Sequence, residues 1–252
     1  MKHLLTLLLI LGFLPPVNSM EISEKGGAVA LTGKIEKGDY DKIVEHLRKR
    51  RDFPDYLLLE SDGGDVLEGT KIGTLFRDTG ATLVVSGPCY SACFFILVAG
   101  VKRVLADQPI GIHRPYFEKK YFAGLSLSDA EMKYRELQSR SRNYLQAMGT
   151  PVAIIEKMLS IPSDDVYILK PHESAFLSQE QPAYSEWVRA QCEMLTPAER
   201  RLFNPFDQFD ESLPKKYESR EQFSRLNAKY LKATECEKGL LQKARKKALS
   251  RS

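Results

Sequence analysis

The strongest constraint on the fold of this chain is a repeated order of short apolar runs and helical segments. Each apolar run is a few residues long and ends in a turn that contains glycine, proline or a polar residue. The expected strands are residues 28–35, 56–60, 81–85, 103–106, 110–113 and 166–169. The expected helices are residues 39–50, 66–77, 91–99, 128–148 and 151–159, in which apolar residues recur at helical spacing. Because continuous apolar strands separated by helices are typical of helix-covered sheets, we expect a layered α/β fold with a buried, mainly parallel sheet.

The composition changes near Gln181 and Pro182, where we expect a domain boundary. Residues 20–182 form the predicted α/β domain, and residues 183–252 form a predicted basic, helical C-terminal extension. The net charge is only +4, but lysine and arginine are concentrated after residue 215. A basic tail can bind nucleic acid or anionic lipid, although a solvated helix face explains it more simply.

The first residues have the order of a secretory signal. A short basic start precedes an almost unbroken apolar run from Leu4 to Leu14, and small or permissive residues follow up to Ser19. The run is too short to span a bilayer comfortably, which needs about 20 apolar residues, so a membrane anchor or a core helix is less favoured. We expect a signal peptide at residues 1–19, no later transmembrane segment, and a periplasmic or secreted protein. Export makes a nucleic-acid partner improbable.

The four cysteines suggest disulfides in an oxidising compartment. Three pairings exist on paper, and we expect Cys89 with Cys93 and Cys192 with Cys236, which keeps each bridge within one region. A zinc site at Cys89, Cys93 and a histidine lacks evident further ligands, so we expect neither a metal nor a cofactor.

Three segments could carry chemistry, each at the end of an expected strand. Residues 62–65 read Asp-Gly-Gly-Asp, and paired glycines let a backbone approach a substrate with free N–H groups. Ser91 opens an apolar helix, where the Ala92 N–H could stabilise an oxyanion. His113 ends another buried strand and could act as the general base of Ser91. An acid would then fix the imidazole, and Asp165 fits this role, with Asp164 as the near competitor. Taken singly, each segment is more often a turn, an N-cap or a core residue.

In order along the chain, these segments resemble the Clp protease proteolytic subunit and, more broadly, the Clp/crotonase fold. The matching pattern is a strand ending in Gly-Gly, then Gly-x-x-x-Ser-Ala opening an apolar helix that Ala-Gly closes. A basic strand, a strand ending Ile-His-x-Pro, a long helix and an aspartate before an aromatic follow. The chain is most similar to exported Clp-like proteins with a Cys-x-Ser-Ala-Cys segment, over residues 28–181.

The resemblance implies a catalytic triad of Ser91, His113 and Asp165, with the backbone N–H groups of Gly64 and Ala92 as the oxyanion hole. It implies a periplasmic serine peptidase that acts on a peptide or protein through an acyl-enzyme. A homo-oligomer is a further partner that the resemblance allows. The main alternative is a catalytically inactive Clp-fold binding or assembly protein. Crotonase chemistry on acyl-CoA is less favoured, because coenzyme A is not expected outside the cytoplasm.

Overall fold

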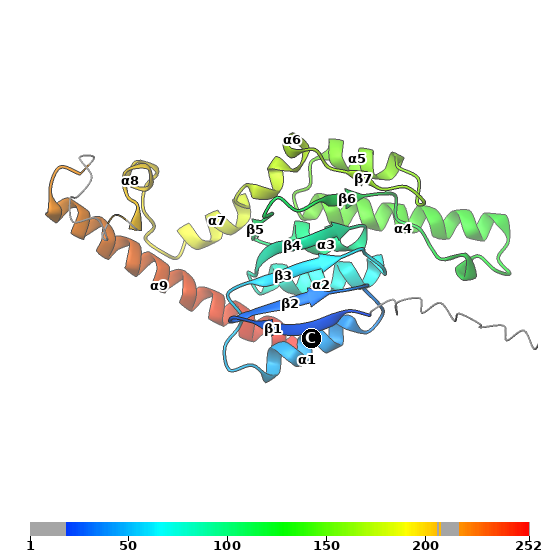
Figure 1. Cartoon of the computed structure of the whole chain (residues 1–252), viewed down its shortest axis with the longest axis horizontal. Coiled ribbons are helices and arrows are strands. Elements are labelled where there is room, and N and C mark those ends of the chain that lie inside the picture. The colour runs from blue at the N-terminus through cyan, green and yellow to red at the C-terminus, as the bar shows by residue number, and fades with distance from the viewer. Residues whose placement is uncertain (1–18, 206, 208–216, 252) are drawn as a thin grey trace, which may run out of the picture.

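The protein is an α/β protein built around one mixed sheet (Figure 1). The computed structural model describes residues 19–205, 207 and 217–251. The expected signal peptide, apart from Ser19, therefore lies outside the described residues. Within the described ranges, no helix is long and apolar enough to cross a membrane.

Within the described residues the sheet has seven strands in the order β1-β2-β3-β4-β6-β7, and β5 also pairs with β4. The strands are β1 (Glu21–Lys25), β2 (Ala28–Thr32), β3 (Leu57–Ser61), β4 (Thr82–Tyr90), β5 (Lys102–Val104), β6 (Ile110–Ile112) and β7 (Tyr167–Ile168). Strands β2, β3, β4 and β6 run parallel, as do β4 and β5, whereas β1 and β7 pair antiparallel at the two edges. The centre of the sheet is thus parallel, as the apolar runs predict.

The helices of the first 180 residues follow the predicted order closely. They are α1 (Asp39–Lys49), α2 (Val66–Asp78), α3 (Ala92–Ala99), α4 (Leu127–Ala147), α5 (Val152–Ser160) and α6 (Pro171–Ser174), with short 3-10 turns η1 (Lys119–Tyr121) and η2 (Ala175–Ser178). Every residue of α3 is buried. Glycines let α2 approach this helix closely, because a Cβ on Gly69 would lie 2.9 Å from the Ala92 carbonyl oxygen. Helix α3 is therefore held rigidly between α2 and the sheet.

The sheet differs from the sequence analysis in one strand that was not predicted and in two expectations that were wrong. Strand β1 was not predicted, because its sequence Glu-Ile-Ser-Glu-Lys is mostly polar and pairs at an exposed edge. The turn expected at residues 86–88 is absent from the described chain, since β4 runs on to Tyr90 and changes partner from β5 to β6 along its length. The sheet is also less buried than predicted: burial alternates along β3 and β4, which leaves Leu58 and Val84 half-buried.

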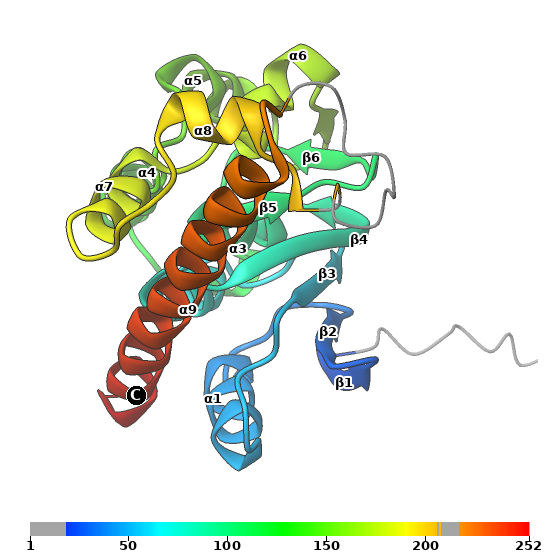
Figure 2. The same ribbon diagram turned by 90° about the vertical axis from the view of Figure 1, so that its left-hand side faces the viewer.

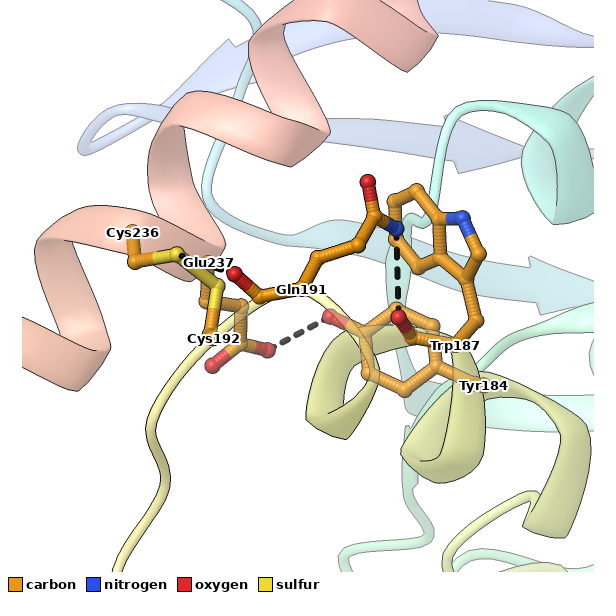
Figure 3. The surroundings of a disulfide bond; sticks show 6 residues. All are labelled: Tyr184, Trp187, Gln191, Cys192, Cys236 and Glu237. Atoms are coloured by element: carbon orange, nitrogen blue, oxygen red, sulfur yellow. Dashed lines mark hydrogen bonds between the residues drawn. A yellow bond between two sulfur atoms is a disulfide. The ribbon is translucent and has the colours of Figure 1, made fainter.

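The C-terminal extension is helical, as predicted. It contains α7 (Pro182–Arg189), α8 (Pro197–Leu202) and the long α9 (Arg220–Arg251). The Cys192–Cys236 disulfide joins the chain just after α7 to the middle of α9 (Figure 3). Beside this disulfide, the Tyr184 hydroxyl donates to Glu237 at 2.5 Å, and Lys102 forms an ion pair with the same carboxylate at 2.7 Å. Burial and this hydrogen bond raise the pKa of Tyr184, so the phenol stays protonated as a donor.

Helix α9 packs across the edge of the sheet at which the parallel strands begin. Arg245 donates to the Thr79 carbonyl, just before β4, and its guanidinium lies 4.4 Å from the Phe53 ring, just before β3. Arg48, at the end of α1, donates to the Leu249 carbonyl. Figure 2, which faces this edge, shows α9 running in front of the sheet. The extension is therefore attached at the amino ends of the strands.

Candidate functional site

The candidate site lies at the opposite edge, where β3, β4 and β6 end. Ser91 directly follows β4, and its N–H donates to the Gly111 carbonyl of β6 at 3.0 Å. His113 directly follows β6, two residues beyond Gly111. The turn with Gly63 and Gly64 follows β3. Because parallel strands end at a common edge, three of the predicted site segments lie next to one another.

Ser91 has an unusual backbone conformation. Its φ is 55° and its ψ is −119°, a combination that costs a residue with a side chain about 1–3 kcal/mol. This conformation lets the chain turn sharply from β4 into α3 and leaves Ser91 half-buried at the helix start, although Ala92 is fully buried. Ser91 makes no side-chain cap on α3. The expectation that it could be a simple N-cap therefore does not describe its geometry.

Gly63 packs directly against Ser91. A Cβ on Gly63 would lie 2.6 Å from the Ser91 Cβ and 3.1 Å from the Ala92 nitrogen. Gly63 also has a φ of +102°, which favours glycine. Both steric room and backbone conformation thus require glycine here. The sequence singled out the glycine pair of residues 62–65, but not the contact of Gly63 with Ser91.

The two predicted oxyanion donors are both backbone N–H groups without a hydrogen bond to any described residue. Gly64 lies in a bridge with Ile35, which bonds to the residues on either side: the Ile35 N–H donates to the Gly63 carbonyl, and the Asp65 N–H donates to the Ile35 carbonyl, each at 2.8 Å. The Gly64 N–H is left unused between them. The carboxylate of Asp65 accepts from the Glu68 N–H at 2.9 Å and so caps α2. It makes no hydrogen bond with the Gly64 N–H.

His113 is buried, at 8% exposure, and its Nδ1 lies 3.1 Å from the Arg114 carbonyl oxygen. A carbonyl only accepts, so this contact requires a proton on Nδ1, and in the neutral imidazole the lone pair is then on Nε2. No hydrogen bond joins His113 to Ser91 among the described residues.

Asp165 and His113 lie just outside the antiparallel pair of β6 and β7, and no hydrogen bond joins them among the described residues. The last pair of β6 and β7 is Ile112 with Tyr167, so His113 follows one member of this pair and Val166, the neighbour of Asp165, precedes the other. Asp165 is exposed, and its carboxylate accepts from the Val166 N–H at 2.7 Å. Asp164 is exposed as well. Neither carboxylate is hydrogen-bonded to the imidazole in the described structure.

A disulfide brackets Ser91. Cys89 and Cys93, both buried, are joined with a Cα–Cα distance of 5.2 Å, and the described cysteines are all paired. The two predicted pairings are therefore confirmed. Disulfide sulfurs cannot ligate zinc as thiolates, and the described residues contain no cluster of three metal-ligating side chains.

Arg103 supports the far end of the helix that Ser91 opens. Its guanidinium donates to the Val98 carbonyl in the last turn of α3 and to the carbonyls of Phe176, Leu177 and Gln179. Burial, and then the neighbouring Arg77, lower the pKa of Arg103 to about 10, so it remains charged at neutral pH. A cation at a helix C-terminus is favourable for the helix dipole. The sequence showed this residue only as part of a basic strand.

A cleft of about 790 Å³ lies elsewhere, between α1, α2 and the end of α9. Its lining includes Tyr40, Thr74 and Lys247 but none of the residues at the strand ends. Two acidic and three basic side chains share this cleft, which gives it no single charge preference.

A scan against family models finds no match to the chain, and no curated protein matches it. The described structure alone defines the class of this protein. It is an α/β protein with a seven-stranded mixed sheet, two disulfides and a serine at the sharp turn from a strand into a helix.

Proposed function

We propose that the protein is a periplasmic serine peptidase of the Clp/crotonase type, with Ser91 as its nucleophile. The observation that carries the proposal is the strained, positive-φ backbone of Ser91 at the start of a fully buried helix, packed against Gly63. A strained residue persists only where its surroundings hold it, and such residues cluster at active sites. The two disulfides, which favour an oxidising compartment, support the location.

In the proposed reaction, Nε2 of His113 takes the hydroxyl proton of Ser91 as the oxygen attacks the substrate carbonyl. The tetrahedral oxyanion accepts hydrogen bonds from the N–H groups of Gly64 and Ala92. His113 then gives its proton to the leaving amine, and an acyl ester remains on Ser91. Water, deprotonated by the same imidazole, releases the acid and restores the serine. An extended peptide would pair with backbone near Gly64.

In this proposal the Arg114 carbonyl fixes the tautomer of His113, and Asp165 is the candidate acid that joins it during reaction. The hydrogen bond from Nδ1 supports the first role. Asp165 would have to exchange its contact with the Val166 N–H for one with the imidazole. Because Nδ1 carries one proton, Asp165 would replace the Arg114 carbonyl as its acceptor when substrate binds. Catalytic hydrogen bonds are often long or unformed without substrate, which accounts for their absence from the present geometry.

The test is intact-mass analysis after exposure to a fluorophosphonate. The Ser91 oxygen would bond to phosphorus and fluoride would leave, which gives one adduct per chain. The adduct should be absent from Ser91→Ala and present in Ser224→Ala, which changes an exposed serine of α9. An adduct that survives in Ser91→Ala, or no adduct on the folded protein, would contradict the proposal.

The second candidate function is a non-catalytic binding protein. The observation that favours it is the missing chain of hydrogen bonds from Ser91 through His113 to Asp165 in the described structure. A folded wild-type protein that does not react with the fluorophosphonate would support this alternative.

A further inference from the structure

We propose that the Cys89–Cys93 disulfide is a positioning element of the site, which holds Ser91 in its strained, positive-φ conformation. The inference rests on the proposed function of Ser91 and concerns how the site is kept in its reactive form. Its basis is the place of the disulfide: Cys89 lies two residues before Ser91 in β4, and Cys93 lies two residues after it in the first turn of α3.

The strained turn has few other restraints. The Ser91 N–H donates to Gly111, and the Ser91 carbonyl accepts from the Phe94 N–H, each at 3.0 Å. Gly63 packs against Ser91, but glycine has no side chain that could restrain the serine. The disulfide fixes the distance between the last residues of the strand and the first turn of the helix, and Ser91 lies midway between them.

The size of the loop indicates a local role. A bridge between residues four apart removes little freedom from the unfolded chain, whereas the Cys192–Cys236 bridge closes a separation of 44 residues. Cys89 and Cys93 are buried, at 0% and 1% exposure, so they contact the core and the site but not solvent. A short, buried bridge around one strained residue is best explained by the geometry of that residue.

Loss of the bridge should release two features together. The Ser91 side chain could relax toward an ordinary backbone conformation, and the Ala92 N–H would move with it, since the two residues share a peptide group. Removal of one oxyanion donor reduces turnover by about 10²–10³-fold in a serine protease. We therefore expect the double variant Cys89→Ala/Cys93→Ala to react with the fluorophosphonate about 10²-fold more slowly than wild type.

The matched control is Cys192→Ala/Cys236→Ala, which removes the other disulfide. This control should unfold at a lower temperature than the Cys89→Ala/Cys93→Ala variant and yet react at the wild-type rate. A second site variant, Cys89→Val/Cys93→Ala, fills more of the buried volume and guards against loss of packing as the cause. Equal reaction rates in wild type and in the folded site variants would overturn the inference while leaving the proposed function intact.

Amide hydrogen exchange gives a readout that needs no reactivity. In the site variants, the amides of Ser91 and Phe94 should exchange at least 10-fold faster, while amides later in α3 keep their protection. Unchanged exchange at these two amides would overturn the inference even where the wild-type protein does not react with the reagent. Failure of the proposed function, by contrast, appears as an unreactive wild-type Ser91.

Discussion

Replacement of Gly63 by alanine tests the packing on which the site depends. The new Cβ would lie 2.6 Å from the Ser91 Cβ, about 0.8 Å inside the ordinary contact limit of 3.4 Å. A left-handed alanine costs about 1–2 kcal/mol, and an overpacked contact costs about 1–3 kcal/mol. We therefore expect Gly63→Ala to lower the free energy of unfolding by about 2–5 kcal/mol. A shift of roughly 1 Å at the nucleophile should also reduce the rate of reaction with a fluorophosphonate by about 10²-fold.

Gly38→Ala is the matched control for this change. Gly38 has a φ of +100°, close to the +102° of Gly63, but a Cβ there would have no neighbour within 4 Å. The control therefore carries the conformational cost of about 1–2 kcal/mol alone and should leave the reaction rate unchanged.

Urea unfolding of both variants gives the difference in unfolding free energy, and the fluorophosphonate reaction gives the difference in rate. A Gly63→Ala protein that is no less stable than Gly38→Ala and reacts at the wild-type rate would refute the contact between Gly63 and Ser91. If stability falls but the rate does not, the contact exists and has no part in the reaction.

The remaining predictions concern His113 and Asp165, the disulfide of the C-terminal extension, and Glu173 in α6. His113→Gln should slow the fluorophosphonate reaction at least 10³-fold. Asp165→Asn should slow it by up to about 10⁴-fold, as expected for loss of the acid of a triad. A loss of less than 10-fold for Asp165→Asn would show that the carboxylate does not join the imidazole during reaction. Removal of the Cys192–Cys236 disulfide should lower the free energy of unfolding by about 4 kcal/mol in the chain-entropy model, measured by urea unfolding; an unchanged value would contradict a restraint on the unfolded chain. Hydrogen bonds from a lysine side chain, a backbone N–H and a tyrosine hydroxyl lower the pKa of Glu173 from 4.5 to about 2. The contribution of the Glu173 carboxylate to stability is therefore present above pH 4.5 and is lost as the pH falls toward 2. Glu173→Gln should therefore be less stable than wild type at pH 7 and equal to it near pH 2, and a difference that persists at pH 2 would refute this origin.

Much of the fold could be predicted because the pattern of the sequence matches local structure. Helix α3 reads as an apolar run closed by glycine, and it is fully buried. Strand β1 could not be predicted, because its residues alternate without a clear apolar face and its pairing with β2 depends on the turn at Gly26 and Gly27. The length of β4 was also missed. Pro88 suggested a turn, but the strand continues through it, and the N–H of the next residue, Cys89, donates to the Pro109 carbonyl just before β6.

The site could be predicted at the level of segments and not of contacts. The end of each strand is visible in the sequence, so Ser91 and His113 were expected at one edge. The strain at Ser91 and the fit of Gly63 against it arise from long-range packing, which no local pattern records. The hydrogen bond from His113 goes to the carbonyl of Arg114, and a backbone carbonyl has no sequence signature.

The C-terminal extension and the candidate site occupy opposite ends of the same strands. Thr79, which receives a hydrogen bond from α9, lies before β4, and Ser91 lies after it. A lid over Ser91 would have to contact the carboxyl ends of the strands, where the turn of Gly63 and the start of α3 lie. The contacts of α9 described above are instead with the chain before β3 and β4, with the end of α1, with β5 and with α7, so this helix does not cover the candidate site. Any role of α9 in docking or assembly would therefore be separable from the reaction at Ser91, and variants of one end should not alter the other.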